Sequence, residues 1–211
     1  MNIMRQELNA PVLGVTVADA PEAFEAIHEP GCAAAIWQRQ PLPAFQNWID
    51  GLNPGALPHA RLILKPNAAQ VAVSAICDDV GLIKDPMRDI LVDDISALVD
   101  LFSSAMKVSH VRLRLDVVTG NACKKFHIDA LTARLVCTYR GTGTQYGAAP
   151  DRAAPQRIFT VPTGAPIVIR GTEYPTSPKS DLLHRSPPIE GTGETRLVLV
   201  LDPVISQDEG A

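Results

Sequence analysis

The 211-residue chain lacks a long apolar run and lacks any excess of positive charge. No stretch approaches the roughly 18 apolar residues of a membrane-spanning helix, so we expect neither membrane insertion nor a membrane partner. Lys and Arg number 19 against 23 Asp and Glu, for a formal net charge of −4. Nucleic-acid binding needs clustered basic residues, so we do not expect a nucleic-acid partner.

Cysteine is also scarce and is not arranged in pairs. Cys32, Cys77, Cys123 and Cys137 are scattered without a C-x-x-C motif, which excludes a disulfide scaffold in a chain of this length. The N-terminus has no basic region leading into an apolar core, so no signal peptide is expected. The chain is therefore predicted to be a reduced, cytoplasmic protein.

Proline is the residue type present in excess. The 18 prolines exceed the usual share of about 5%, and most lie in short connectors. This favours brief strands joined by stiff turns over a helical bundle. The clearest helix is predicted over 86–106, where Asp85 can cap the N-terminus and apolar residues recur every three or four positions. From 110 the apolar residues alternate, which predicts a half-buried strand over 110–118.

Several further short elements are predicted along the chain. Helices are expected at 21–28 and 43–52, and strands at 12–17, 32–37, 61–65, 124–129, 133–140, 157–161, 166–170, 182–185 and 196–202. Many short strands with frequent turns are typical of a sandwich, jelly roll or barrel. We expect an α+β protein, with a mixed part over 1–108 packed on a β core over 109–205, as one compact domain overall.

Two of the five histidines have surroundings suited to a metal. His127 and Asp129 are two apart, so in a strand both side chains project to the same face. His184 follows at the end of an apolar segment. Two His and one carboxylate form the facial triad of non-haem Fe(II) oxygenases, which leaves positions for a cosubstrate and dioxygen. Arg196 on the last strand could clamp the distal carboxylate of 2-oxoglutarate.

Other interpretations of these residues stay open. His127 and Asp129 could be a hydrogen-bonded pair on a strand, and His184 a core histidine. If the alternation from Asp129 continues, Cys137 and Tyr139 also face the ligands, and a thiolate would favour Zn(II) over iron. Arg134 and Arg140 share a strand face by parity, as a basic rim for an acidic substrate or as solvated surface residues, and Arg185 adjoins His184 as a further candidate near the site.

Three segments carry a resemblance to a known family. The runs Cys137-Thr-Tyr-Arg-Gly-Thr-Gly-Thr144, His184-Arg-Ser-Pro187 and Arg196-Leu-Val-Leu-Val-Leu-Asp202 resemble an uncharacterised bacterial family, domain of unknown function 1826, over most of the chain. The resemblance implies a link to metal homeostasis, because genes of that family often lie near zinc-homeostasis and metallochaperone genes.

At a coarser level, the order His-x-Asp, His, Arg resembles the Fe(II)/2-oxoglutarate dioxygenases. That resemblance implies a double-stranded β-helix core, jelly-roll or cupin-like, with Fe(II) and 2-oxoglutarate as cofactors. The spacing from His184 to Arg196 is slightly longer than that superfamily's commonest one. We therefore expect an oxidoreductase that acts on a small-molecule or unknown substrate. The alternative is a zinc-binding protein that uses the same site without redox catalysis. A homodimer through an edge strand is left open.

Overall fold

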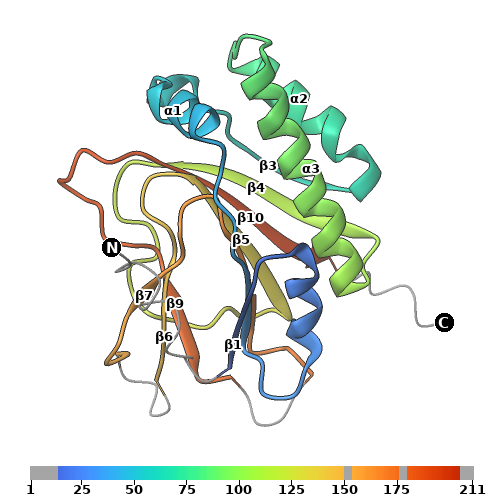
Figure 1. The fold of residues 1–211 in the computed structure, drawn as a ribbon, viewed down its shortest axis with the longest axis vertical. Coiled ribbons are helices and arrows are strands. Elements are labelled where there is room, and N and C mark those ends of the chain that lie inside the picture. Colours follow the sequence, from blue (N-terminus) through green and yellow to red (C-terminus); the bar gives the residue numbers. More distant parts are fainter. Residues whose placement is uncertain (1–13, 150–153, 176–179, 205–211) are drawn as a thin grey trace.

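The structure, a computed structural model, describes residues 14–149, 154–175 and 180–204. It is an α+β fold in which a large sheet faces a smaller one (Figure 1). The large sheet has seven strands in the order β1-β2-β8-β5-β10-β4-β3. These strands are β1 (Val15–Ala18), β2 (Ala34–Trp37), β3 (Ala60–Leu64), β4 (His110–Val118), β5 (Ala133–Arg140), β8 (Pro166–Arg170) and β10 (Arg196–Val204). The α+β class expected from the sequence is confirmed.

The smaller sheet has three strands in the order β7-β6-β9. They are β6 (Gln145–Ala148), β7 (Phe159–Thr160) and β9 (Leu182–Arg185). In the large sheet, β10 pairs antiparallel with both β4 and β5, and only β1 and β2 pair in parallel. Strands from both sides of residue 108 thus belong to the same sheet.

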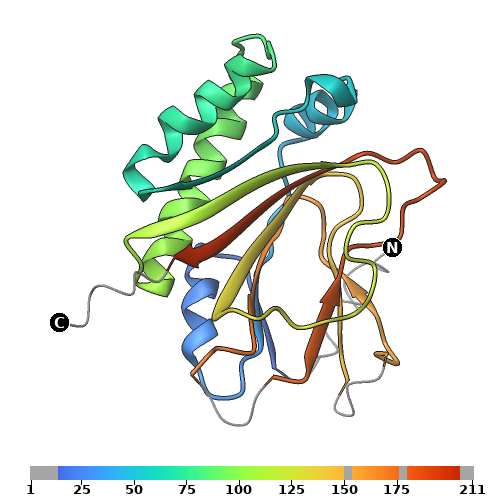
Figure 2. The same cartoon turned by 180° about the vertical axis from the view of Figure 1, so that it is seen from behind.

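Helices cover one face of the large sheet (Figure 2). They are α1 (Pro43–Gly51), α2 (Ala69–Asp79) and α3 (Pro86–Met106), with 3₁₀ turns η1 (Pro21–His28), η2 (Pro54–Ala56) and η3 (Pro66–Ala68). Helix α3 has the predicted bounds because Asp85 caps it, accepting hydrogen bonds from the backbone N–H groups of Met87 and Arg88. No helix among the described residues is long and apolar enough to cross a membrane.

Two apolar clusters lie on opposite faces of the large sheet. The first joins α3 to the sheet and includes Leu98 and Phe102 together with Leu135 and Leu199. The second lies between the two sheets and includes Val136, Ile167, Val198, Tyr146 and Leu182. Successive residues of a strand point to opposite faces, so β5 and β10 each contribute to both clusters.

Several predicted elements need correction. Residues 124–129 do not form a strand, because this loop is anchored by side chains and makes only one isolated backbone bridge, between His127 and His184. The strand predicted at 157–161 is reduced to β7, and that at 12–17 begins at Val15, with 12 and 13 outside the described residues. Helix α2 and strand β6 were not predicted.

Candidate metal centre

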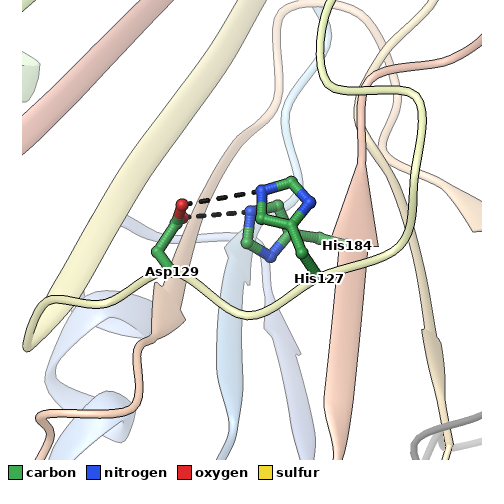
Figure 3. Close-up of side chains that lie close together, drawn as sticks. All are labelled: His127, Asp129 and His184. Atoms are coloured by element: carbon green, nitrogen blue, oxygen red, sulfur yellow. Dashed lines mark ion pairs between the residues drawn. The ribbon is translucent and has the colours of Figure 1, made fainter.

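Three polar side chains converge between the two sheets. His127 and Asp129 come from the loop that follows β4, and His184 comes from β9 (Figure 3). The backbones of the two histidines exchange hydrogen bonds, each N–H donating to the other's carbonyl oxygen at 3.0 Å. This bridge places the ring centroids 4.5 Å apart. The structure therefore brings together the three residues that the sequence singled out.

Distances between the donor atoms suit a single ion. His184 Nε2 lies 3.1 Å from Asp129 Oδ2, and His127 Nε2 lies 3.6 Å from Asp129 Oδ1. Ligands at about 2.1 Å from a metal and at right angles to each other are about 3.0 Å apart. One ligand atom from each of the three residues lies within 4.8 Å of the others. Small movements would thus let all three bind one ion.

Hydrogen bonding around the cluster fits the same role. His127 Nδ1 donates to the Lys125 carbonyl oxygen at 2.8 Å, which leaves Nε2 with a free lone pair in the neutral ring. Asp129 Oδ2 and His184 Nδ1 are buried and make no hydrogen bond among the described residues. A buried carboxylate oxygen without a hydrogen bond is costly, and a metal ion would satisfy it.

A glycine holds the backbone of Asp129 in place. Gly171, just after β8, donates its N–H to the Thr132 carbonyl at 2.8 Å, and Thr172 donates to the Asp129 carbonyl at 2.9 Å. A Cβ atom at Gly171 would overlap the Leu131 carbonyl oxygen and lie 2.7 Å from that of Asp129. Only glycine allows this close approach, so Gly171 fixes where the Asp129 loop lies.

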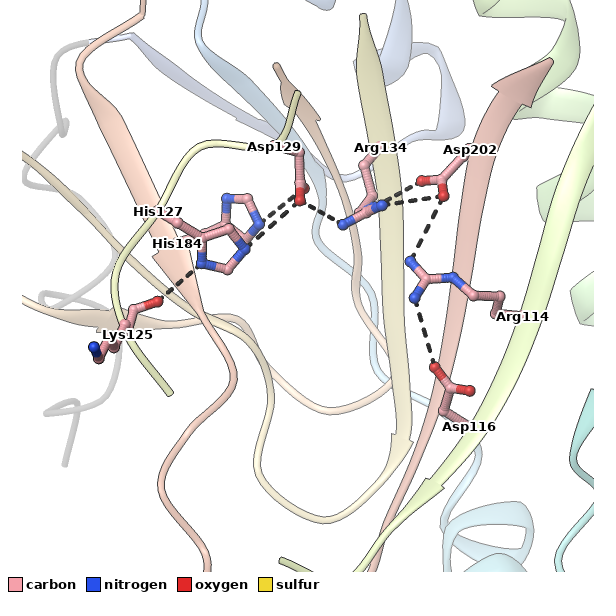
Figure 4. Close-up of polar contacts among 8 residues, drawn as sticks. All are labelled: Arg114, Asp116, Lys125, His127, Asp129, Arg134, His184 and Asp202. Atoms are coloured by element: carbon pink, nitrogen blue, oxygen red, sulfur yellow. Dashed lines mark hydrogen bonds and ion pairs between the residues drawn. The ribbon is translucent and has the colours of Figure 1, made fainter. Parts of the chain in front are cut away.

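Arg134 on β5 orients the Asp129 carboxylate. Its Nη1 donates to Asp129 Oδ1 at 2.6 Å, while Nε and Nη2 donate to the two oxygens of Asp202 at 2.6 and 3.0 Å (Figure 4). These two hydrogen bonds to Asp202 form a bidentate pair, which fixes the plane of the guanidinium. Arg134 therefore occupies one oxygen of Asp129 and leaves the other directed at His184.

Charges in the cluster shift two ligand pKa values. Burial alone would raise the pKa of Asp129, but its contacts with His127 and His184 and the charge of Arg134 lower it far below its usual range. Interaction with the Asp129 carboxylate raises the pKa of His127, although burial opposes this. The carboxylate is therefore ionised at neutral pH, and a metal would displace a proton from His127 at mildly acidic pH.

Arg196 lines the same cavity, of about 120 Å³, as His127 and His184. It is 1% exposed, and its Nε donates to the Thr142 carbonyl at 2.6 Å. It makes no ion pair with any carboxylate in the part of the chain that the structure describes. Burial lowers the pKa of Arg196 to about 10, which leaves it charged at neutral pH, and the nearby Glu194 opposes the shift. A buried cation without an ion pair is suited to binding an anion.

Two of the predicted neighbours of the site, Cys137 and Tyr139, lie on the other face of β5. Cys137 is buried on the helix-facing side of β5, with its Sγ 3.7 Å from the Gly164 carbonyl oxygen. Tyr139 is on the same side and donates to Asp94 at 2.7 Å. The predictions for both are wrong, because the irregular loop after Asp129 breaks the alternation.

The two remaining arginine predictions differ in outcome. Arg140 does not share a face with Arg134: it donates to the Leu52 carbonyl at 2.7 Å, since a register shift between β10 and β5 turns it toward α1. Arg185 lines the cavity, donates to the Gln145 side chain at 2.8 Å and lies over the Phe126 ring at 4.4 Å.

Sequence reasoning missed Asp202 and Arg114. Asp202 shares its parity on β10 with Arg196, so it was recognisable as a residue of the same face. Arg114 lies on the polar face of β4, and one of its guanidinium nitrogens is 3.6 Å from Asp202. No local signal shows that these residues join Arg134 and Asp129 in one network, because they come from three different strands.

The fold is similar to that of several solved enzymes. The structure is similar to dioxygenase for auxin oxidation 1 from Arabidopsis thaliana, solved as a complex with 2-oxoglutarate, with a TM-score of 0.56 and 10% identity over 93% of this chain and 94% of that one. The rice dioxygenase for auxin oxidation has a TM-score of 0.51 and 12% identity, over 93% and 84%. The expected double-stranded β-helix core is thereby confirmed.

The family itself is identified from the sequence. Residues 18–202 match the model described as protein of unknown function DUF1826, and the chain belongs to this family. No curated protein matches the sequence.

Proposed function

We propose that this protein is an Fe(II)- and 2-oxoglutarate-dependent oxygenase. The observation that carries the proposal is the convergence of His127, Asp129 and His184. The two histidines line one cavity together with the buried Arg196, within a double-stranded β-helix. Two imidazoles and one carboxylate are the ligand set of non-haem Fe(II) oxygenases. When bound, Fe(II) with 2-oxoglutarate supplies the oxidation of a substrate by dioxygen, with release of succinate and carbon dioxide.

The residues around the cavity each have a defined role in this proposal. His127, Asp129 and His184 hold the ion, and Arg134 keeps one Asp129 oxygen turned toward it. The guanidinium of Arg196 pairs with the distal carboxylate of 2-oxoglutarate, which supplies the ion pair that Arg196 does not form with any described residue. Val198 and Val200 add apolar side chains to the lining of this cavity.

Metal analysis of untagged protein, combined with a test for Fe(II)-dependent conversion of 2-oxoglutarate to succinate, examines the proposal. We expect one ion per chain and slow succinate formation even without the primary substrate. His127→Ala, Asp129→Ala and His184→Ala should each lose the ion and remain folded. His110→Ala, a histidine on β4 whose ring contacts Ser109, is the matched control and should keep it.

Arg196→Gln separates the cosubstrate from the ion. It should bind metal like the unaltered protein and bind 2-oxoglutarate about tenfold or more weakly, because a charge-assisted pair is lost. One tightly held zinc per chain, without succinate formation when iron is supplied, would instead favour the zinc-binding alternative.

A further inference from the structure

Three arginines share the cavity-side face of β3 and β4, and we call Arg61, Arg112 and Arg114 the arginine ladder. Arg61 lies directly opposite Arg114 in the pairing of the two strands. Arg112 is two residues before Arg114 and so faces the same way. Like charges directly opposite each other destabilise an antiparallel pair. The protein therefore carries an unfavourable charge arrangement at this position.

The ladder is only partly neutralised by the protein, because Arg114 has two ion pairs and Arg112 lies opposite Asp202 in the pairing of β4 with β10. Arg61 and Arg112 make no ion pair or side-chain hydrogen bond among the described residues. Arg114 forms two ion pairs, with Asp202 at 3.6 Å and Asp116 at 4.0 Å, and both are longer than a hydrogen bond. Asp202 is already bound by Arg134 at 2.6 Å. The Nε of Arg114 is buried and makes no hydrogen bond, which is a cost that a bound acceptor would remove.

The position of the ladder links it to the candidate metal centre. Arg114 lines the same cavity as His127 and His184, and Arg112 and Arg61 continue from it to the exposed edge of the sheet. Arg61 and Asp116 also line an open hollow of about 520 Å³ beside that edge. One end of the ladder, Arg114, thus lines the cavity of the candidate metal centre, and the other end, Arg61, is exposed to solvent.

We propose that the arginine ladder binds an anionic group, a carboxylate or a phosphate, of the primary substrate. This inference rests on the proposed oxygenase function, and it names an acidic small molecule as the substrate class. Arg114 lines the same cavity as Arg196, the residue proposed for 2-oxoglutarate, but the two arginines stand at different positions along the sheet. Arg114 pairs with Val200, four residues along β10 from Arg196, or about 13 Å at the rise of a strand.

Anion titrations of the metal-free protein, followed in NMR spectra of the arginine Nε–H groups, test the inference. The probes are inorganic phosphate and acetate, each against chloride at equal ionic strength. We expect saturable shifts at Arg61 and Arg114. Tighter binding of phosphate would indicate a phosphate group on the substrate, and tighter binding of acetate a carboxylate. Arg61→Gln should weaken binding about tenfold, because a charge-assisted hydrogen bond is lost.

Arg157→Gln is the matched control, because Arg157 is exposed and precedes β7 in the smaller sheet, away from the cavity. It should leave anion binding unchanged. Arg61 is exposed, so its replacement should not unfold the protein, whereas Arg114→Gln is checked for folding first. Charged side chains on an edge strand also prevent pairing between molecules. If that is the ladder's only role, phosphate and acetate will shift Arg61 and Arg157 equally and without saturation, which overturns the inference.

The titration does not depend on the metal. A protein that binds anions at the ladder but takes up no ion contradicts the proposed oxygenase and leaves the anion site standing. A protein that binds Fe(II) and 2-oxoglutarate, with no anion response at Arg61 or Arg114, contradicts the inference alone.

Discussion

The two faces of β5 and β10 differ sharply in chemistry. Toward the helices, Leu135 and Leu199 are buried in a continuous apolar cluster with α3. Toward the smaller sheet, the same two strands carry the largely buried charged residues Arg134, Arg196 and Asp202 beside the apolar cluster between the sheets. One face of these two strands therefore stabilises the fold, and the other face keeps charged groups away from water.

This difference shows where the protein departs from what stability alone favours. Apolar burial on the helix side contributes about 25 cal/mol per Å². Charges on the other side must be paired or bind something to offset their lost hydration. The pairs from Asp129 through Arg134 to Asp202 do so in part, whereas Arg196 forms no ion pair with any of the residues that the structure describes. Such exceptions are typical of functional sites.

Replacing a side chain of the apolar face should have the largest effect. Leu135→Ala removes a fully buried side chain and should lower the free energy of unfolding by about 2–5 kcal/mol. Urea denaturation measures this. The folded variant should bind metal normally, because Leu135 faces away from the cavity. Ile63→Ala, at a position 54% exposed on β3, is the control and should change stability by less than about 0.5 kcal/mol.

Arg134→Gln should chiefly affect metal binding. Without its bond to Asp129 Oδ1 the carboxylate can rotate, and loss of such a supporting contact weakens metal affinity about 10- to 100-fold, or roughly 1.4–2.7 kcal/mol. Titration with Fe(II) under anaerobic conditions measures it. Arg140→Gln, on the same strand but against α1, should bind metal normally. Equal affinities for the two variants would contradict the role assigned to Arg134.

Acidification should weaken metal binding gradually, by less per pH unit than the loss expected for Arg134→Gln at its upper limit. The Asp129 carboxylate raises the pKa of His127, so the metal-free protein gains stability from protonated His127 at low pH and loses it as pH rises through that pKa. The ion needs the neutral ring. Below this pKa the affinity should therefore fall by about tenfold per pH unit for each proton displaced. Titrations between pH 8 and pH 5 measure this slope, and a flat profile would exclude His127 as a ligand.

Cys137→Ser should have the smallest effect on the metal. Its thiol faces Gly164, across β5 from the histidines, so metal affinity should stay unchanged. A loss of zinc affinity would show that the thiol is a ligand after all. Burial raises the pKa of Cys137 to about 12, so iodoacetamide should modify the exposed Cys123 and leave Cys137 unmodified until the protein unfolds. Mass spectrometry of the alkylated protein measures this.

Elements with strong local signals were predicted with the bounds that the structure has. Helix α3 begins at its Asp85 cap, and β4 shows plain alternation of apolar and polar residues. Helix α2 was missed because it has no side-chain cap and because its β-branched residues Val71, Val73 and Ile76 favour strands. Strand β6 was missed because its four residues include a glycine and show no alternation.

The sequence by itself determined which residues could form a metal site: two histidines and a carboxylate in a characteristic order, with an arginine after them. Tertiary structure alone decided what surrounds them. Alternation fixes the direction of side chains within one strand, but the loop between Asp129 and β5 and the register shift beside Arg140 reset it. Cys137 therefore lies in the apolar core, while Arg134, Asp202 and Arg114, from three strands, face the site.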